Sequence, residues 1–195
     1  AVFGSYVDRV NGRDLLHVVQ EFVDGEDLAS WSKNNLLDQS TIVQILIDTL
    51  GVLEHLHVAQ PPILHRDIKL SNLMRRLDGR IVLIDFGQAV QDVHRTLGQT
   101  MVTGTIGYQA PEQIMGDATP KSDVYSIGVV AVELWTGTPA YKMLQGQILR
   151  WEKHCRKLPL SVQEWLDAVL HPEVSERYTS QQACAHLRQL TEAFV

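Results

Sequence analysis

The feature that most constrains the fold is a segment that is apolar on nearly every side of a helix. Its apolar members are Val124, Ile127, Val129, Val130, Ala131, Val132 and Leu134. At 3.6 residues per turn these positions cover most of the helix circumference, and such a helix must be buried. Thr136-Gly137 ends the pattern, and Ser122 is the predicted N-cap of a helix over residues 123–135.

Five other segments predict further helices around this one. Apolar residues recur at three- and four-residue spacing in most of them. The predicted ranges are 28–34, 42–56, 147–154, 161–170 and a last helix from residue 180. Asp38 or Ser40 caps the second of these, while Ser161 and Glu164 form a predicted capping box for the fourth.

Two strand pairs complete the expected secondary structure. Residues 6–10 and 15–20 flank Asn11-Gly12, which favours a tight hairpin turn. Residues 73–74 and 81–84 flank Asp78-Gly79, a second hairpin signal. The expected fold class is therefore α+β, mostly helical, with a small β element at the start.

Composition excludes several classes of function. A chain of 195 residues can form one domain with a substantial core. Its net charge of −6 does not favour nucleic acid or an anionic membrane. Two cysteines make no disulfide framework, which favours a reducing compartment, so we expect a cytoplasmic protein. No apolar run is long enough to span a bilayer, and the first residues lack a signal peptide.

Groups suited to phosphoryl transfer concentrate in residues 64–72 and 84–87. Asp67 can orient a hydroxyl and take its proton, and Lys69 places positive charge beside a phosphoryl group. Asn72 and Asp85 offer oxygens to a hard cation. The second hairpin puts Asn72 just before one strand and Asp85 just after the other. We therefore expect both residues at the same end of this strand pair.

Three motifs in this region carry a resemblance to a known family. His65-Arg66-Asp67 followed by Asn72 fits the pattern H-R-D-x-x-x-x-N, and Asp85-Phe86-Gly87 fits D-F-G. Ala110-Pro111-Glu112 supplies A-P-E downstream. Each triplet is weak by itself, but the three in this order are a strong signal. The chain resembles eukaryotic-type serine/threonine protein kinases over nearly its whole length, and Lys69 resembles the mark of the Ser/Thr type.

The resemblance implies a domain organisation. Residues 1–20 would be a strand remnant of the kinase N-lobe, residues 21–27 the hinge, and residues 28–195 the C-lobe. Within the C-lobe, residues 65–72 would form the catalytic loop and residues 85–112 the activation segment. The implied cofactors are ATP and Mg²⁺, and the implied partner is a protein substrate with a Ser or Thr acceptor.

The resemblance also assigns site residues. Asp67, Lys69 and Asn72 would be catalytic, and Asn72 with Asp85 would hold Mg²⁺. The nucleotide would meet residues of the hinge and the sheet: Gln20 as gatekeeper, the Glu21 carbonyl and Val23 N–H at the adenine edge, Asp27 near the ribose, Met74 as the floor and Asp85 through the metal.

Other residues would take supporting roles by the same resemblance. His65 would pack against Phe86, and Asp123 would brace the catalytic-loop backbone. Thr105 would hydrogen-bond near Asp67 and Lys69, while Glu112 and Arg177 would form a buried ion pair. Arg66 could bind a phosphothreonine of the activation loop, with its acceptor among three residues: Thr96, Thr100 and Thr103. The remaining histidines, His55 and His57 among them, are expected to be surface or packing residues.

The sequence departs from the family pattern at its start. We find no Gly-rich loop, strand Lys or helix Glu, and Lys33 is the only lysine before Asp67. Either the chain is the C-terminal portion of a full kinase, with the N-lobe expected upstream, or the protein naturally lacks that lobe. The intact catalytic-loop residues favour the first explanation. We then expect the chain alone to bind ATP weakly, to turn over little and to be prone to association.

The sequence is also compatible with two other functions. One is a non-catalytic, pseudokinase-like binding module that docks partners through its C-lobe. The other is a small-molecule phosphotransferase of kinase-like fold. Such enzymes typically lack the A-P-E segment, so Ala110-Pro111-Glu112 together with Thr105 argues for a protein substrate.

Overall fold

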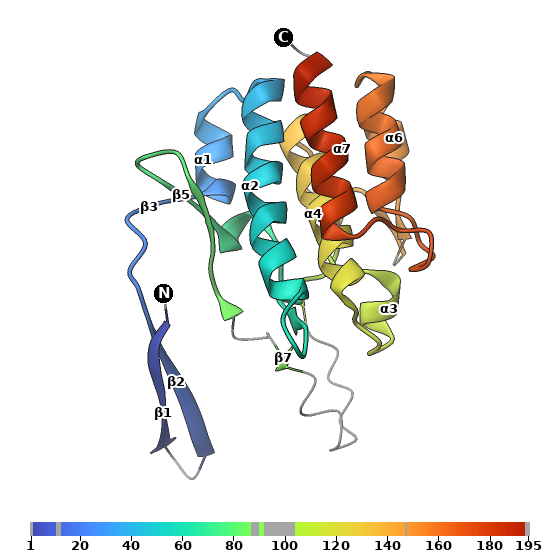
Figure 1. Ribbon diagram of the computed structural model, residues 1–195. Coiled ribbons are helices and arrows are strands. Elements are labelled where there is room, and N and C mark those ends of the chain that lie inside the picture. The colour runs from blue at the N-terminus through green and yellow to red at the C-terminus, as the bar shows by residue number, and fades with distance from the viewer. Residues whose placement is uncertain (1, 11–12, 87–89, 92–103, 147, 194–195) are drawn as a thin grey trace.

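The computed structural model describes residues 2–10, 13–86, 90–91, 104–146 and 148–193. A body of helices carries a small sheet on one side, and a long hairpin projects from the body (Figure 1). Three long helices run side by side in the body: α2 (Gln39–His57), α4 (Pro120–Thr136) and α7 (Ser180–Ala193). The expected α+β, mostly helical fold is confirmed.

The apolar helix α4 lies at the centre of the body, as its sequence requires. Every residue from Ser122 to Leu134 is buried. It contacts α2, α7, α5 (Glu152–Cys155) and α6 (Leu160–Val169). A Cβ placed on Gly128 would come within 2.7 Å of the Leu170 side chain, so this glycine allows the close approach of the end of α6.

The predicted N-cap of α4 is wrong, whereas its predicted end is confirmed. The helix begins at Pro120, with Thr119 as N-cap, so Ser122 lies inside the first turn. Proline is well suited to the first helical position because its missing N–H needs no partner there. Gly137 ends the helix in the left-handed conformation with φ 63°, as expected of a C-terminal glycine.

The other long helices follow their apolar periodicity. Asp38 caps α2 by accepting a 2.8 Å hydrogen bond from the Thr41 N–H, which decides between the two predicted caps. The short helix α1 (Leu28–Asn34) is capped by Asp27. The apolar positions predicted for α6 and α7 are buried: Val162, Trp165, Leu166, Val169, Leu170, Cys184, Leu187 and Leu190.

Two predictions in the segment before α6 are wrong. In place of a helix over 147–154 the chain forms β8 (Leu144–Gln145), β9 (Ile148–Leu149) and the short α5. Leu149 and Trp151 are buried on either side of exposed Arg150, an alternation that suits extended chain. Pro159 precedes α6 without a side-chain cap, so Ser161 lies within the helix and the predicted capping box is absent there.

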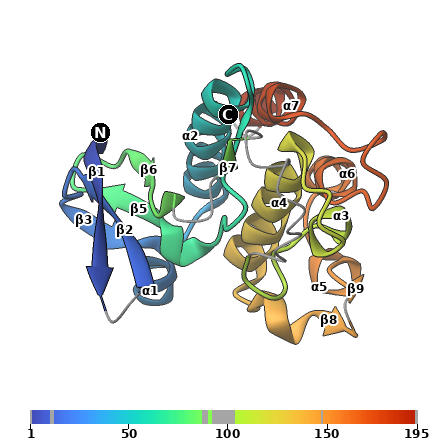
Figure 2. The same cartoon turned by 90° about the horizontal axis from the view of Figure 1, so that it is seen from below.

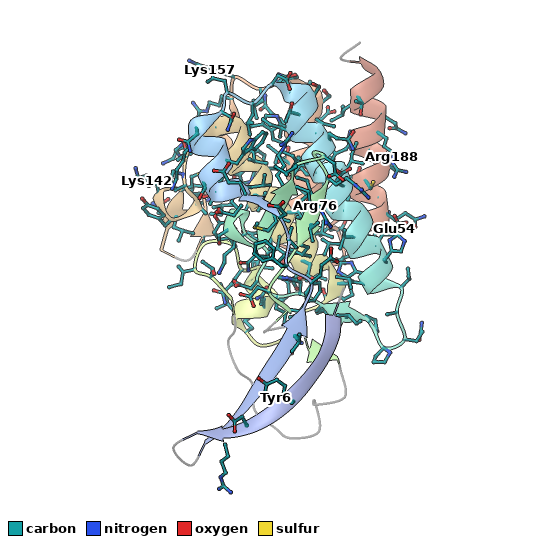
Figure 3. All side chains as sticks on the ribbon, turned by 90° about the vertical axis from the view of Figure 1, so that its left-hand side faces the viewer. Tyr6, Glu54, Arg76, Lys142, Lys157 and Arg188 are labelled. Atoms are coloured by element: carbon teal, nitrogen blue, oxygen red, sulfur yellow. The ribbon has the colours of Figure 1, made fainter. Side chains whose placement is uncertain are left out.

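The strands form small antiparallel sheets. The projecting hairpin pairs β1 (Val2–Val10) with β2 (Arg13–Gln20), and its Asn11-Gly12 turn lies outside the described residues. Exposed Tyr6 lies on this hairpin, away from the helices (Figure 3). A three-stranded sheet has the order β3 (Gly25–Asp27), β5 (Leu73–Arg76), β6 (Ile81–Leu83).

The predicted hinge, residues 21–27, is only partly irregular, because residues 25–27 form β3, an edge strand of the three-stranded sheet. The sheet lies beside α1 and α2 (Figure 2). The remaining elements are short: β4 (Ile63–Leu64) with β7 (Val90–Gln91), the 3₁₀ turns η1 (Leu70–Asn72) and η4 (Ala140–Lys142), and α3 (Pro111–Ile114). Within the described ranges, no helix combines the length and apolar character needed to cross a bilayer.

Candidate active site

The loop from His65 to Asn72 is fixed to the centre of the helical body. The two carboxylate oxygens of fully buried Asp123, on α4, accept the N–H groups of His65 and Arg66, each at 2.9 Å. The Gln113 side chain donates a 2.6 Å hydrogen bond to the Arg66 carbonyl from the other side. The expected bracing by Asp123 is confirmed, because its carboxylate accepts two consecutive backbone N–H groups of the loop.

Backbone strain concentrates at this loop and at its neighbour. Among the described residues, the non-glycine residues with positive φ are Arg66 at 66° and Asp85 at 64°. Such a conformation costs about 1–3 kcal/mol and persists only where surrounding contacts enforce it. Both residues belong to motifs identified from the sequence, which is typical of a functional site.

Three side chains converge on the carboxylate of Asp67, which is only 5% exposed. The Lys69 ammonium lies 2.7 Å from Oδ2, and the Thr105 hydroxyl donates to Oδ1 at 2.7 Å. The Asn72 amide donates to Oδ2 at 3.1 Å and to the Asp67 carbonyl at 2.8 Å. Lys69 also donates to the Thr105 hydroxyl at 2.9 Å, which confirms the contact expected of Thr105.

These contacts keep the Asp67 carboxylate ionised. Burial by itself would raise the pKa of Asp67, but the hydrogen bonds from Lys69 and Thr105, the Lys69 charge and the Asn72 amide outweigh it. The net effect is a pKa below the ordinary value. A negatively charged, oriented carboxylate is therefore present near neutral pH.

The β5–β6 hairpin brings the backbones of Asn72 and Asp85 to one end of the sheet. Leu73 pairs with Leu83, and the Ile84 N–H donates to the Asn72 carbonyl at 2.9 Å. Asp85 follows directly and is exposed. Because the Asn72 amide donates to Asp67, its oxygen Oδ1 is the atom left for another partner. Asn72 and Asp85 therefore lie at the same end of the β5–β6 pair, as the sequence predicts.

His65 has the packing role expected of it. Its ring meets the Phe86 ring edge-on, with centroids 4.9 Å apart, and its Nε2 lies 3.0 Å from the Ile84 carbonyl. The imidazole is fully buried, so it links the catalytic loop to the residues around Asp85. Gly87 lies outside the described residues, as do the candidate phosphorylation sites Thr96, Thr100 and Thr103.

The segment that carries Thr105 is fixed to α4 at its other end. The Tyr108 hydroxyl donates to the Glu133 carboxylate, and the Ser126 hydroxyl donates to the Tyr108 carbonyl at 2.8 Å. Burial raises the pKa of Glu133, and burial together with Glu133 raises that of Tyr108. Gly107, at φ 97°, packs against Ala140. The segment is therefore anchored at both ends, by Thr105 at Asp67 and by Tyr108 at α4.

The expected ion pair between Glu112 and Arg177 is present, with the arginine buried and the glutamate partly buried. The guanidinium donates to both carboxylate oxygens at 2.6 and 3.1 Å, and Arg177 is 1% exposed. The Ser122 hydroxyl also donates to Glu112 at 2.6 Å. Burial would raise the pKa of Glu112, but Arg177 and Ser122 lower it below its ordinary value.

The residues predicted to meet a nucleotide have varied surroundings. Asp27 and Met74 are cross-strand neighbours in the β3–β5 pair. Both oxygens of Asp27 accept hydrogen bonds from Ser30, so this carboxylate serves first as the cap of α1. The Glu21 side chain contacts Arg76 at 3.3 Å, and Val23 follows in irregular chain. The side chain of Gln20 lies outside the described part. The nucleotide roles of these five residues and of Asp85 remain predictions.

Several residues support the site although the sequence does not predict this role for them. The sequence predicts a surface or packing role for His57, yet its Nε2 lies 3.1 Å from Asp123 and its Nδ1 3.3 Å from the Ser180 hydroxyl. Gln113, Ser122 and Glu133 also support the site through contacts described above. Each of these contacts joins residues at least ten positions apart, and the spacing of residues along the chain carries no signal for them.

Comparison with known proteins decides the family. Residues 4–187 match the family described as the protein kinase domain. The chain belongs to the protein kinase family. The kinase assignment agrees with the motifs and with the contacts that Asp67, Asp123 and Glu112 make.

Serine/threonine kinases are among the relatives of this chain. Serine/threonine-protein kinase PknA from Nostoc sp. is 32% identical over 186 residues, which covers 89% of this chain and 32% of PknA. Serine/threonine-protein kinase B from Synechocystis sp. is 34% identical over 180 residues, covering 85% of this chain and 31% of that protein. PTI1-like tyrosine-protein kinase 1 from Arabidopsis thaliana is 47% identical over 105 residues, covering 52% and 29%. The chain thus spans about a third of the length of these relatives.

Proposed function

We propose that this chain carries the catalytic loop of a protein kinase that transfers the γ-phosphate of ATP to a Ser or Thr hydroxyl of a protein. The observation that carries the proposal is the Asp67 carboxylate, held ionised by Lys69, Thr105 and Asn72. A buried, oriented carboxylate can accept a hydrogen bond from a substrate hydroxyl and take its proton as the oxygen attacks phosphorus.

Lys69 and Thr105 support this role of Asp67. The Lys69 ammonium lies beside the carboxylate and can offset negative charge on a phosphoryl group that approaches it. Thr105 belongs to the segment that Glu133 and Ser126 fix through Tyr108. We infer that this segment places the acceptor chain next to Asp67, which is the positioning that phosphoryl transfer mostly depends on.

The oxygen atoms of Asn72 and Asp85, at the end of the β5–β6 pair, suit magnesium. Mg²⁺ binds through one or two protein oxygens with phosphate and water, and Asn72 Oδ1 with the Asp85 carboxylate offers such oxygens. When bound with ATP, the ion would neutralise charge on the phosphate oxygens. In the described part of the chain, no three His, Cys, Asp or Glu side chains are placed so that they could hold a metal ion together. A magnesium ion bound with ATP does not need such a group.

The test is phosphate transfer by this chain and by its Asp67→Asn variant. The purified chain is incubated with radiolabelled ATP, Mg²⁺ and a generic protein substrate such as myelin basic protein. We expect transfer that is low, because no Gly-rich loop or strand Lys is found in the sequence, and that falls at least about a hundredfold in Asp67→Asn. Equal transfer by both proteins would refute the role of Asp67.

Phosphoamino acid analysis of the product tests the acceptor type. The names of the relatives include both serine/threonine and tyrosine kinases, so this measurement is needed. We expect phosphoserine or phosphothreonine, because Lys69 reaches both Asp67 and Thr105 where the acceptor would bind. Phosphotyrosine alone would contradict the proposed acceptor.

A further inference from the structure

A large cavity opens next to two residues that contact Asp67. Its volume is about 840 Å³, and its walls come from α1, residues 105–108, the end of α4 and η4. Lys69 and Thr105 line it, and both contact the Asp67 carboxylate. A chain whose hydroxyl reaches Asp67 therefore passes close to this cavity, which can receive residues next to that hydroxyl.

Positive charge at this cavity is better exposed than negative charge. Its charged lining residues in the described part of the chain are Lys33, Lys69 and Glu133. Lys69 is paired with Asp67, but exposed Lys33 forms no ion pair with a described residue. Lys142 adds a second exposed ammonium next to the wall, 6.0 Å from the ring centre of Tyr141 (Figure 3).

The carboxylate of Glu133 is not available to a basic ligand. It is 7% exposed, and one oxygen accepts the Tyr108 hydroxyl while the other accepts the Ala140 N–H. A lysine or arginine entering the cavity would have to displace one of these partners or stay unpaired beside Lys33. A glutamate or aspartate would instead meet an exposed ammonium.

Apolar surface supplies the rest of the recognition. Ile106 is 77% exposed and Tyr141 65% exposed at the rim, and Leu36 projects fully into solvent. All three line the cavity. Exposed apolar side chains gathered at a site commonly mark where a partner chain is bound.

We propose that this cavity selects acceptor segments in which the Ser or Thr is flanked by acidic and apolar residues rather than by basic ones. Lys33 is the specificity-determining residue, and Lys142 reinforces it. The proposal rests on the proposed kinase function for the acceptor at Asp67. It names a substrate class for the site without changing the chemistry proposed there.

The test uses one set of peptides in two measurements. The peptides share a length and a central serine and carry glutamate and leucine, lysine and leucine, or alanine at the flanking positions. The first measurement is the rate of phosphorylation with ATP and Mg²⁺. The second is binding by fluorescence anisotropy, with the serine replaced by alanine so that turnover is not needed.

We expect the glutamate–leucine peptide to be preferred over the lysine–leucine peptide in both measurements. Lys33→Gln should reduce that preference by about twofold to fivefold, the effect of one exposed ion pair. The matched control is Lys157→Gln, which removes the same charge from an exposed lysine that does not line the cavity (Figure 3). Its preference should equal that of the unchanged chain.

The outcomes separate this proposal from the proposed function. Phosphorylation with no preference, or with a preference for lysine, would overturn the substrate class and leave the kinase chemistry intact. Preferential binding of the acidic peptide without phosphorylation of any peptide would support the cavity's selectivity and contradict catalysis by this chain. Failure of every peptide to bind would overturn the proposal, as would an equal effect of the two lysine variants.

Discussion

The buried ion pair between Glu112 and Arg177 offers the sharpest test of the fold. The side chain of Arg177 makes five hydrogen bonds: two to Glu112 and one each to the carbonyls of Lys121, His171 and Pro172. Its guanidinium also lies over the Tyr125 ring at 5.0 Å. Arg177 thus links α3, the start of α4 and the loop before α7.

Glu112→Gln leaves this buried guanidinium without a counter-charge. Removing one partner of a buried pair costs about 3–5 kcal/mol. Arg177→Met should cost more, because three backbone carbonyls also lose a donor, and each group left unsatisfied adds about 1–3 kcal/mol. A domain of this size is typically stable by about 5–15 kcal/mol, so both variants should be strongly destabilised.

Urea denaturation followed by far-UV circular dichroism measures these free energies. The double variant Glu112→Gln/Arg177→Met lacks both charges, so its loss should be smaller than the sum of the single losses by about 2–3 kcal/mol. Additive losses, or a loss below about 1 kcal/mol for Glu112→Gln, would refute the view that the two charges stabilise the fold as a buried pair.

Three further predictions concern pH, the catalytic loop and two glycines. Because the pKa of Glu112 is lowered on folding, its stabilisation is complete above its ordinary value of 4.5 and is lost as pH falls through the lower folded value; the melting temperature of Glu112→Gln should change less over that range. Asp123→Asn removes the charge that holds two backbone N–H groups, so it should cost about 1.5–3 kcal/mol and speed hydrogen exchange at His65 and Arg66; unchanged exchange would count against the bracing role. Gly51→Ala, in the middle of α2 with open space around its Cβ, should stabilise the chain by about 0.5–1 kcal/mol. Gly137→Ala, at φ 63°, should destabilise it by about 1 kcal/mol, and thermal melts that show the same sign for both glycines would contradict this reasoning.

Local sequence signals located most of the elements. The periodicity of α2, α6 and α7 and the Asp78-Gly79 turn between β5 and β6 depend on residues a few positions apart, so they can be identified without the fold. The helix predicted over residues 147–154 is wrong because a short apolar run fits either a helix or a strand. The burial of Leu149 and Trp151 against the body decided between the two.

The sequence by itself determined the family and the candidate site residues. The reason is that His65-Arg66-Asp67, Asn72, Asp85-Phe86-Gly87 and Ala110-Pro111-Glu112 are short motifs whose residue types carry the signal. The sequence also determined that α4 must be central, since a helix that is apolar all round has no face to leave in water. Only the tertiary structure decided which side chains meet at Asp67 and which support them. Thr105 reaches Asp67 across 38 positions, and His57 reaches Asp123 across 66. Such contacts follow from how the helices pack around α4, and packing depends on the whole chain at once rather than on any one segment of it.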